Sequence, residues 1–280
     1  MAVRPPTAWR VFSRHRVSLV GLGLLVALLG VVVFGSVLQP FDPERVGAGP
    51  SLVPPDATHL MGTDELGRDV LSRVVSGTRV SMLVGLSAAL ISTLLGIVLG
   101  AFAGFFGGWI DDLLMRITEV FQIIPRFFLA MMLVAFFGAS ILNLILAIAL
   151  LSWPQLARIV RAEFLTLKSR HYVDAARVVG ASTPALIFAE ILPNALGPVI
   201  VSATLLVGQA IIIEAGLSYI GLGDPNQVSL GLMLQQAQQI MRTAWWSTAF
   251  PGLVIFLTVL GINLAGDGLN DVFNPRSRDR

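Results

Sequence analysis

Six apolar stretches of membrane-spanning length recur along this chain, and no other feature limits its possible folds as strongly. A helix rises about 1.5 Å per residue, so about 20 residues cross the roughly 30 Å hydrocarbon core of a bilayer. Backbone N–H and C=O groups inside lipid must bond within the protein, which favours helices. The sequence therefore predicts an all-α integral membrane protein with six transmembrane helices. We place them at residues 17–38, 80–106, 113–137, 141–157, 195–217 and 246–265.

The composition supports a membrane protein and excludes several other classes. Hydrophobic residues make up 55% of the chain and charged residues 13%, whereas soluble domains carry roughly 25% charged residues. The net charge of +2 is small and spread over loops, so we expect no nucleic-acid partner. The chain has no Cys and its three His lie far apart in the sequence, so we expect no disulfide and no metal site.

Basic residues at both ends of the chain predict its orientation. Several Arg precede the first apolar stretch, and three Arg occur in the last seven residues. Arg and Lys are enriched on the cytoplasmic side, so we expect both termini there, which agrees with an even number of crossings. We expect residues 1–79 to hold a cytoplasmic tail, the first helix and an extracytoplasmic loop. Residues 80–275 would then form the five-helix core, and residues 276–280 a second cytoplasmic tail.

One charged stretch, residues 158–194, interrupts the apolar pattern between the fourth and fifth helices. Its excess of basic residues places it in the cytoplasm. Good helix formers fill its first part, Asp174 suits the first turn of a second, short helix, and Gly180 would end that helix. We expect this short helix to seat in a partner protein, with Ala175 and Ala176 offering a small flat face. A solvated loop that merely connects two helices is the alternative.

Within this stretch, Asp174-Ala175-Ala176 precedes Gly180, and Ile191-Leu192-Pro193-Asn194 follows. The pattern resembles the EAA loop of ABC importer permeases, with Asp174 where that family has Glu. The resemblance implies the architecture of a type I importer permease, in which the short helix is a coupling helix that contacts an ATPase subunit. The coupling residues that it implies are Tyr172, Asp174, Ala175, Ala176, Gly180, Leu192 and Pro193.

A second motif lies in the first outer loop, where residues 60–73 read LMGTDELGRDVLSR. It is similar to the GTDxxGRDxxSR segment of the dipeptide, oligopeptide and nickel branch of these permeases, which are binding-protein-dependent transport inner membrane components. We expect Asp69 and Arg73 to pair at i,i+4 spacing. The segment either folds as a cap over the outer helix ends or contacts a binding protein or substrate. Further stretches similar to that branch lie at residues 115–125, 214–223 and 263–271.

The resemblance implies a permease subunit that moves di- or oligopeptides across the inner (cytoplasmic) membrane of a cell. The partners that it implies are membrane lipid, a homologous second permease subunit, two cytoplasmic subunits that bind ATP and Mg, and an extracytoplasmic substrate-binding protein. Nickel chelates, glutathione and other small solutes are alternative substrates within the family. The chain contains no GxxxxGK[ST] motif, so we expect no ATPase site, cofactor or catalytic residue of its own.

A different class of function is a secondary transporter driven by an ion gradient. Such transporters carry inverted repeats or paired broken helices near the membrane midplane. Here no internal repeat is evident, and the acidic residues gather in loops and at helix ends. An intramembrane metalloprotease is disfavoured because the chain has no HExxH motif. The sequence therefore favours ATP-driven transport.

Ionisable residues within the apolar stretches are functional candidates, because charge at membrane depth is costly. Arg116 and Glu119 have i,i+3 spacing and are expected to pair. Arg126 has no acidic residue nearby in the sequence, so it either faces a water-filled substrate path or pairs with a helix of a second subunit. Glu214 lies near the outer end of the fifth helix, where its side chain is expected to reach water. Arg126 and Glu214 are thus the candidate residues of the substrate path, whereas Gln209 is expected to hydrogen-bond between helices.

Three glycines mark one face of the second helix. Gly96, Gly100 and Gly104 recur every four residues. Without side chains, such a face lets another helix approach closely. We expect it to be buried against a neighbouring helix.

Overall fold

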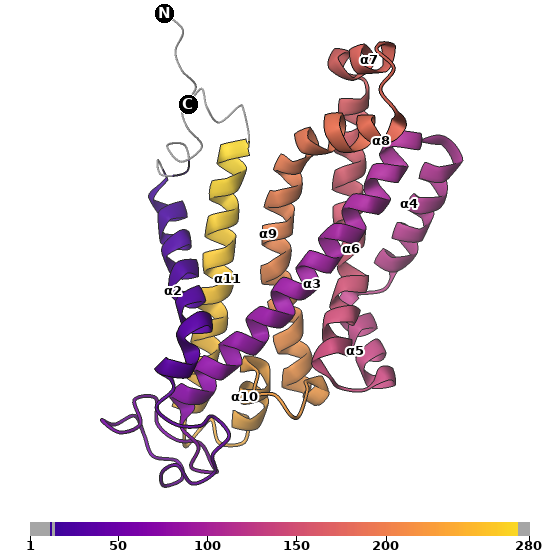
Figure 1. Cartoon of the computed structure of the whole chain (residues 1–280). Helices are drawn as coiled ribbons and strands as arrows, with labels where there is room; N and C mark the ends of the chain where they lie inside the picture. Colours follow the sequence, from indigo (N-terminus) through magenta and orange to yellow (C-terminus); the bar gives the residue numbers. More distant parts are fainter. Residues whose placement is uncertain (1–11, 13–14, 274–280) are drawn as a thin grey trace, which may run out of the picture.

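The computed structural model describes residue 12 and residues 15–273, which Figure 1 shows as a bundle of long helices. Within these residues, β structure is limited to one isolated bridge between Thr63 and Asp69. The predicted all-α class is therefore confirmed. The helices are α2 (Arg16–Leu38), α3 (Val70–Phe106), α4 (Gly108–Ile123), α5 (Arg126–Phe137), α6 (Ile141–Lys168), α7 (His171–Val178), α8 (Thr183–Ala185), α9 (Leu192–Leu217), α10 (Leu230–Ala237) and α11 (Trp246–Phe273), with the π-helical segments η1 (Leu186–Ile191) and η2 (Ser218–Leu222) at the ends of α9.

The bundle is built around α3, which crosses it diagonally and packs against α6 and α9 (Figure 1). On one side α2 and α11 pack against each other, while α4 and α5 lie on the other side next to α6. The start of α2, the end of α11 and α7 share one end of the bundle. At the opposite end lies a layer, here called the cap, that consists of residues 39–69 and α10. The two candidate functional segments are therefore at opposite ends of the molecule.

Membrane-length helices account for most of the described chain. Five helical segments are long and apolar enough to cross a bilayer: α2, α3, α6, the continuous Thr183–Leu222 helix and α11. The pair α4 and α5 also qualifies when taken together, although the two are bent by 84°. The prediction of six membrane helices agrees with this arrangement if the bent pair is counted as one span.

The bend corrects one prediction, because the apolar pattern indicates a continuous helix over residues 113–137 and the structure shows two. α4 ends at Ile123, the backbone of Ile124 is extended, and α5 begins directly after Pro125. Proline has no N–H to bond to the preceding turn, and it pushes the residue before it out of helical geometry. Hydropathy does not register this break because it measures side-chain polarity alone.

Several helices also extend beyond the apolar stretches that predict them. α3 begins at Val70 instead of residue 80, because the Asp69 side chain accepts a hydrogen bond from the N–H of Ser72 and caps the helix. The boundary expected at residue 79 thus falls inside α3. α6 continues past Ala157, and both α11 and α9 are longer than expected, while α10 lies in a stretch expected to be a loop. Turns that project beyond lipid carry polar residues, so they add nothing to an apolar run.

The glycine face of α3 is buried against α6, as predicted. A Cβ atom added to Gly96 would lie 2.6 Å from the Cβ of Leu156, and one added to Gly104 would lie 2.6 Å from the Cβ of Phe164. Gly100, between them, faces the backbone of α6. The three glycines therefore set how closely the two central helices pack.

Candidate functional site

The charged stretch after the fourth span carries α7 to the far end of the bundle (Figure 1). Val173 of α7 is fully buried and belongs to one hydrophobic cluster with Phe164 of α6 and with Ile187 and Ile191 of η1. Apolar burial of this kind stabilises the docked position of a short helix that would be marginal in isolation. The predicted short helix is thus present, and it is anchored by one face.

The other face of α7 is exposed. Tyr172, Asp174 and Ala175 are all exposed, whereas Ala176 is half-buried because it packs against the cluster around Val173. The flat surface expected from two alanines is therefore offered mainly by Ala175. These three exposed residues are thus available to a partner, while the side of the helix that carries Val173 holds it in place.

Two exposed valines, not identified from the sequence, complete this surface. Val178 and Val179 are each 88% exposed at the end of α7. Exposed apolar side chains at the tip of a projecting segment are typical of a contact surface for another protein. The sequence alone does not identify these residues, because two adjacent valines are common. Their exposure depends on which face of α7 packs against the bundle.

Gly180 ends α7, as predicted, through a defined backbone motif. Its φ is +91°, in the left-handed region that favours glycine. The N–H of Ala181 donates to the carbonyl of Ala176 at 3.0 Å, and the N–H of Gly180 donates to that of Arg177 at 3.1 Å. These two bonds form a Schellman motif, which satisfies the last carbonyls of the helix. Gly180 therefore fixes the direction in which the chain leaves α7.

Leu192 and Pro193 lie at the start of α9. Leu192 is half-buried against the same cluster as Val173, whereas Pro193 is exposed. Pro193 follows the π-helical segment η1 inside the continuous Thr183–Leu222 helix, where its missing N–H interrupts the regular hydrogen bonding of the helix. Of the predicted coupling residues, the structure thus joins Leu192 and Ala176 to the anchor of α7 and leaves the others at the surface.

Two polar contacts tie the base of this segment to the bundle. The guanidinium of Arg161 on α6 donates to both carboxylate oxygens of Asp111 on α4, at 2.5 Å each. The ammonium of Lys168, at the end of α6, donates to the backbone carbonyl of Phe105 on α3 at 2.7 Å. Bidentate and charge-assisted bonds of this kind are the stronger class of hydrogen bond. These contacts therefore join the last turns of α6 to α4 and to the end of α3.

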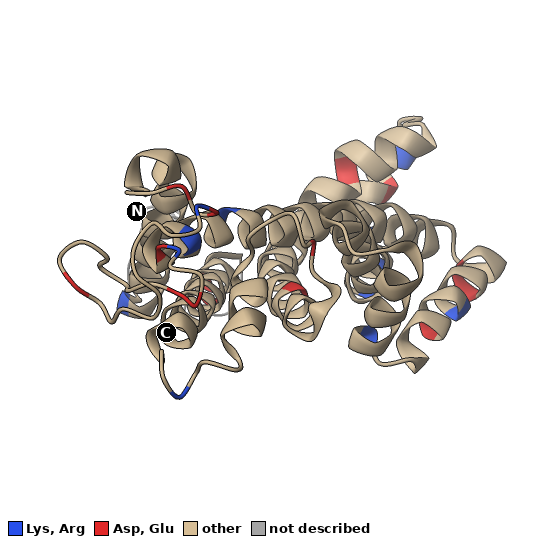
Figure 2. Ribbon diagram, turned by 90° about the horizontal axis from the view of Figure 1, so that it is seen from below, with Lys and Arg blue, Asp and Glu red and all other residues tan. Residues whose placement is uncertain are grey.

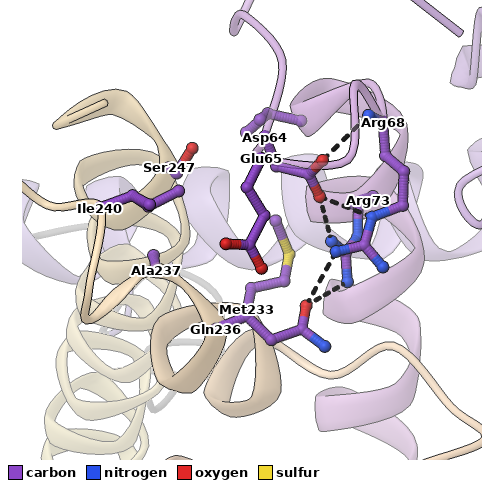
Figure 3. A pocket seen from close by; sticks show the side chains of 10 residues that line it. Asp64, Glu65, Arg68, Arg73, Met233, Gln236, Ala237, Ile240 and Ser247 are labelled. Atoms are coloured by element: carbon purple, nitrogen blue, oxygen red, sulfur yellow. Dashed lines mark hydrogen bonds and ion pairs between the residues drawn. The ribbon is translucent and has the colours of Figure 1, made fainter. Parts of the chain in front are cut away.

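A network of charged and polar residues joins the two parts of the cap, residues 39–69 and α10, to each other and to α3 (Figure 3). Asp64 accepts from Arg68 Nε at 2.6 Å and from Arg73 Nη1 at 2.5 Å, and both guanidinium groups also donate to Gln236 of α10. The expected pair of Asp69 with Arg73 is wrong, because Arg73 turns to Asp64. The geometry supports the interpretation of this motif as a folded cap.

Asp69 instead belongs to a second cluster of hydrogen-bonded polar residues in the cap. Its carboxylate lies 2.9 Å from Nδ1 of His59 and accepts from the N–H and hydroxyl of Ser72. His59 is 4% exposed, so it is a buried part of the fold and not a free polar loop residue. The pKa of Asp56 is held below its usual range, chiefly because the backbone N–H of His59 donates to its carboxylate. The loop of the cap is thus an ordered structure.

The ionisable residues within the spans have three different environments. Arg116 and Glu119 pair at 3.1 Å, as predicted. Glu214 is 1% exposed and accepts hydrogen bonds from the hydroxyls of Ser81 on α3 and Ser218, at 2.8 Å each. The expectation that its side chain reaches water is therefore wrong. Arg126 is half-buried and donates to side-chain amide oxygens on α6 and α9.

Charge is sparse over most of the molecule. Viewed from the cap, the ribbon is largely uncharged, and charged positions gather toward its two sides (Figure 2). In the part of the chain that the structure describes, no group of three or more metal-ligating side chains is placed to hold a metal ion. The geometry is that of a bundle of membrane-length helices with a projecting, partly exposed short helix at one end and a folded cap at the other.

Two family models match this chain. Residues 96–279 match the model described as binding-protein-dependent transport system inner membrane component. Residues 7–57 match the model of the N-terminal transmembrane domain of oligopeptide transport permease C. The first match covers all the helices from the later part of α3 to α11.

Relatives with similarity over nearly the whole chain include permeases named for peptides. The chain is 40% identical over 278 residues to the di/tripeptide transport system permease protein of Pseudomonas aeruginosa, covering 97% of this chain and 92% of that one. It is 42% identical over 275 residues to the dipeptide transport system permease protein of Escherichia coli, covering 96% and 92%. It is 43% identical over 275 residues to the glutathione transport system permease protein of Salmonella typhimurium, covering 96% and 89%.

The fold is similar to that of a solved membrane protein. A chain of the MetNI methionine ABC transporter, in an inward-facing conformation, matches with a TM-score of 0.59 and 19% identity. The match covers 72% of this chain and 96% of that chain. At this level of identity the likeness establishes the fold alone.

Proposed function

The chain belongs to the family of binding-protein-dependent transport system inner membrane components, the permease subunits of ABC importers, and we propose that it carries di- and oligopeptides across the inner membrane. The observation that carries the proposal is the identity of 40% and 42%, over almost the full length, to permeases named for di/tripeptides and dipeptides. The helical bundle, broken at α4 and α5, is consistent with a path between helices. Glutathione, itself a small peptide, is the second candidate because relatives that are 39% to 43% identical are named for it.

We propose that α7 is the coupling helix of this permease. Its anchored face, its exposed valines and the fixed exit at Gly180 together make a rigid projection that an ATPase subunit can hold. The contacts at Arg161 and Lys168 provide a route by which a displaced α7 moves α3, α4 and α6. Tyr172, Asp174, Ala175 and the exposed Pro193 contribute to the contact surface, while Ala176 and Leu192 support it.

The proposed complex supplies what this chain lacks. Two ATPase subunits would bind ATP and Mg, a second permease subunit would complete the path, and a binding protein would deliver substrate to the cap. The proposed parts of the chain are an outer part that ends before α3 begins at Val70, a core from α3 to residue 275 through which the transported molecule passes, and residues 276–280. No ATP-binding motif occurs in the sequence, so the chain itself would not hydrolyse ATP.

We propose that α7 faces the cytoplasm and the cap faces outward. The chain has no Cys, so single cysteines at Val178→Cys and Ala57→Cys can be compared without background. In cells that make the permease pair without the ATPase subunits, so that position 178 stays uncovered, an impermeant maleimide added from outside the cytoplasmic membrane is expected to label position 57 strongly. It is expected to label position 178 only after that membrane is permeabilised. The reverse labelling pattern would refute the orientation.

Uptake by the reconstituted complex tests the proposed function. The permease pair and ATPase subunits in liposomes, supplied with binding protein, are expected to accumulate a labelled dipeptide only when ATP reaches the ATPase side. A non-hydrolysable ATP analogue is expected to reduce accumulation to background, because the chain has no energy source of its own. The same assay with glutathione ranks the two substrates.

Three results would count against this proposal. Accumulation of glutathione without dipeptide would assign the chain to the second candidate. Accumulation driven by an ion gradient without ATP would indicate a secondary transporter. Accumulation of neither solute, by a complex that hydrolyses ATP, would exclude both peptide proposals.

A further inference from the structure

The break between α4 and α5 leaves a helix start inside the bundle. α5 begins at Arg126, well within the length of the bundle (Figure 1). No side chain caps it, and the first N–H groups of any helix have no acceptor within the helix. In discontinuous membrane helices, such starts are the positive ends that face anionic groups of a substrate. The break therefore adds to the positive potential at Arg126.

Arg126 has no anionic partner among the described residues. Its Nη2 donates to Gln155 Oε1 of α6 at 3.1 Å, and its Nη1 lies 3.5 Å from Gln209 Oε1 of α9. Gln155 is near the middle of α6, and Arg126 begins α5 at the break within the bent α4–α5 pair. A guanidinium within a membrane bundle whose side-chain partners are two neutral amides has no counter-charge beside it, which is costly unless an anion or water reaches it.

A small cavity lies beside this group. It has a volume of about 60 Å³ and is lined by Gln155, Ser202 and Gln209 together with three leucines. Side-chain amides both donate and accept hydrogen bonds, and a hydroxyl does the same. If an acidic group displaces the amide oxygens from Arg126, the amide NH₂ groups can turn to donate to it. The cluster is thus suited to alternate between an empty state and an anion-bound state.

We infer that Arg126, Gln155 and Gln209 form an intramembrane site for the carboxylate of the transported peptide. This inference rests on the proposed function, because every linear di- or oligopeptide with a free C-terminus carries such a group. The planar guanidinium can bind both oxygens of a carboxylate, an arrangement that also fixes the direction of the peptide. The amide groups of Gln155 and Gln209 would contribute further hydrogen bonds.

The rival role for Arg126 is a structural ion pair with an acidic residue of the second permease subunit. That role predicts an equal loss of transport for all substrates when Arg126 is changed, since the defect would lie in assembly. Carboxylate recognition predicts a loss that depends on the substrate. A comparison of one dipeptide with its C-terminal amide separates the two.

The experiment measures initial uptake of both forms by the complete reconstituted complex. In Arg126→Gln, uptake of the free acid is expected to fall by about tenfold or more relative to the amide, because a charge-assisted pair is lost. Arg126→Lys is expected to retain part of the preference. Arg116→Gln, which removes an exposed Arg paired with Glu119, is the matched control and should leave the acid-to-amide ratio unchanged. The same binding protein delivers both forms to every variant, so its own preference for the acid or the amide affects all the ratios equally and cancels when variants are compared.

An acid-to-amide ratio equal to that of the native complex would overturn the inference, whether uptake in Arg126→Gln is normal or equally reduced for both forms. If this variant does not assemble, Gln209→Glu keeps the inference testable. The carboxylate introduced at position 209 would pair with the guanidinium of Arg126 and compete with the carboxylate of the peptide. Gln209→Glu is therefore expected to lower the acid-to-amide uptake ratio. An unchanged ratio in Gln209→Glu would also count against the site. Failure of the native complex to take up either form would refute the proposed function instead.

Discussion

Replacing Val178 and Val179 together by Asp is expected to abolish ATP-dependent uptake while leaving the chain in the membrane. Both side chains are 88% exposed, so the change costs the isolated subunit little. In the assembled importer these positions would be buried against an ATPase subunit, and two unpaired carboxylates there would cost several kcal/mol. Uptake is therefore expected to fall by at least about 100-fold, measured as the initial rate in proteoliposomes.

The control uses an exposed valine at the other end of the molecule. Val46 in the cap is 63% exposed, and Val46→Asp is expected to leave the coupling of ATP to uptake intact. Gly180→Trp supplies a second route to the same defect. The Trp side chain would meet open space, since nothing lies within 4 Å of a Cβ atom at this position. A non-glycine residue at φ +91° is strained by about 1 to 3 kcal/mol. The backbone is therefore expected to relax and to redirect the chain at the end of α7. Native uptake rates in the double valine variant at normal expression would refute the coupling role.

Asp64→Asn is expected to loosen the cap, with the second largest effect. The carboxylate of Asp64 contacts Arg68 and Arg73, and the Arg73 side chain is only 4% exposed. Removing one partner of a buried ion pair leaves an uncompensated charge, which costs about 3 to 5 kcal/mol. Limited proteolysis is therefore expected to cut residues 39–69 faster than in the native complex, and the melting temperature should fall.

Glu65→Gln is the matched control for this prediction. Glu65 is the adjacent residue, it is exposed, and no ion pair or hydrogen bond joins it to the other side chains drawn in Figure 3. The substitution removes the same unit of charge from the same loop, so a general charge effect would appear in both variants. Equal protease resistance of the two variants would show that the network around Asp64 does not hold the cap.

Local features of the sequence predict much of this fold. The apolar stretches locate the membrane helices, and the spacing of Gly96, Gly100 and Gly104 predicts the face that packs against α6. The end of α7 follows from Gly180, whose backbone needs no tertiary contact to favour a left-handed turn. Each of these predictions depends on residues close together in the chain.

The predictions that are wrong depend on distant residues or on backbone geometry. Glu214 is buried because Ser81, from a helix far away in sequence, donates to its carboxylate, and no local pattern encodes that contact. Arg73 turns to Asp64 and not to Asp69 because the loop of the cap folds back on α3. The exposure of Val178 likewise follows from the docking of Val173 on the opposite face. Tertiary packing determines the burial and the partners of these side chains, and no local sequence pattern predicts those contacts.

The stimulation of ATP hydrolysis by substrate-loaded binding protein is the most direct measure of whether movement passes through α7. In the reconstituted complex with the native chain, loaded binding protein is expected to raise the rate of ATP hydrolysis. With Val178→Asp and Val179→Asp combined, basal hydrolysis should persist while the stimulation disappears, because the cap can no longer signal to the ATPase subunits. Full stimulation in that variant would contradict the account, since the cap and the ATPase subunits would then communicate without this surface.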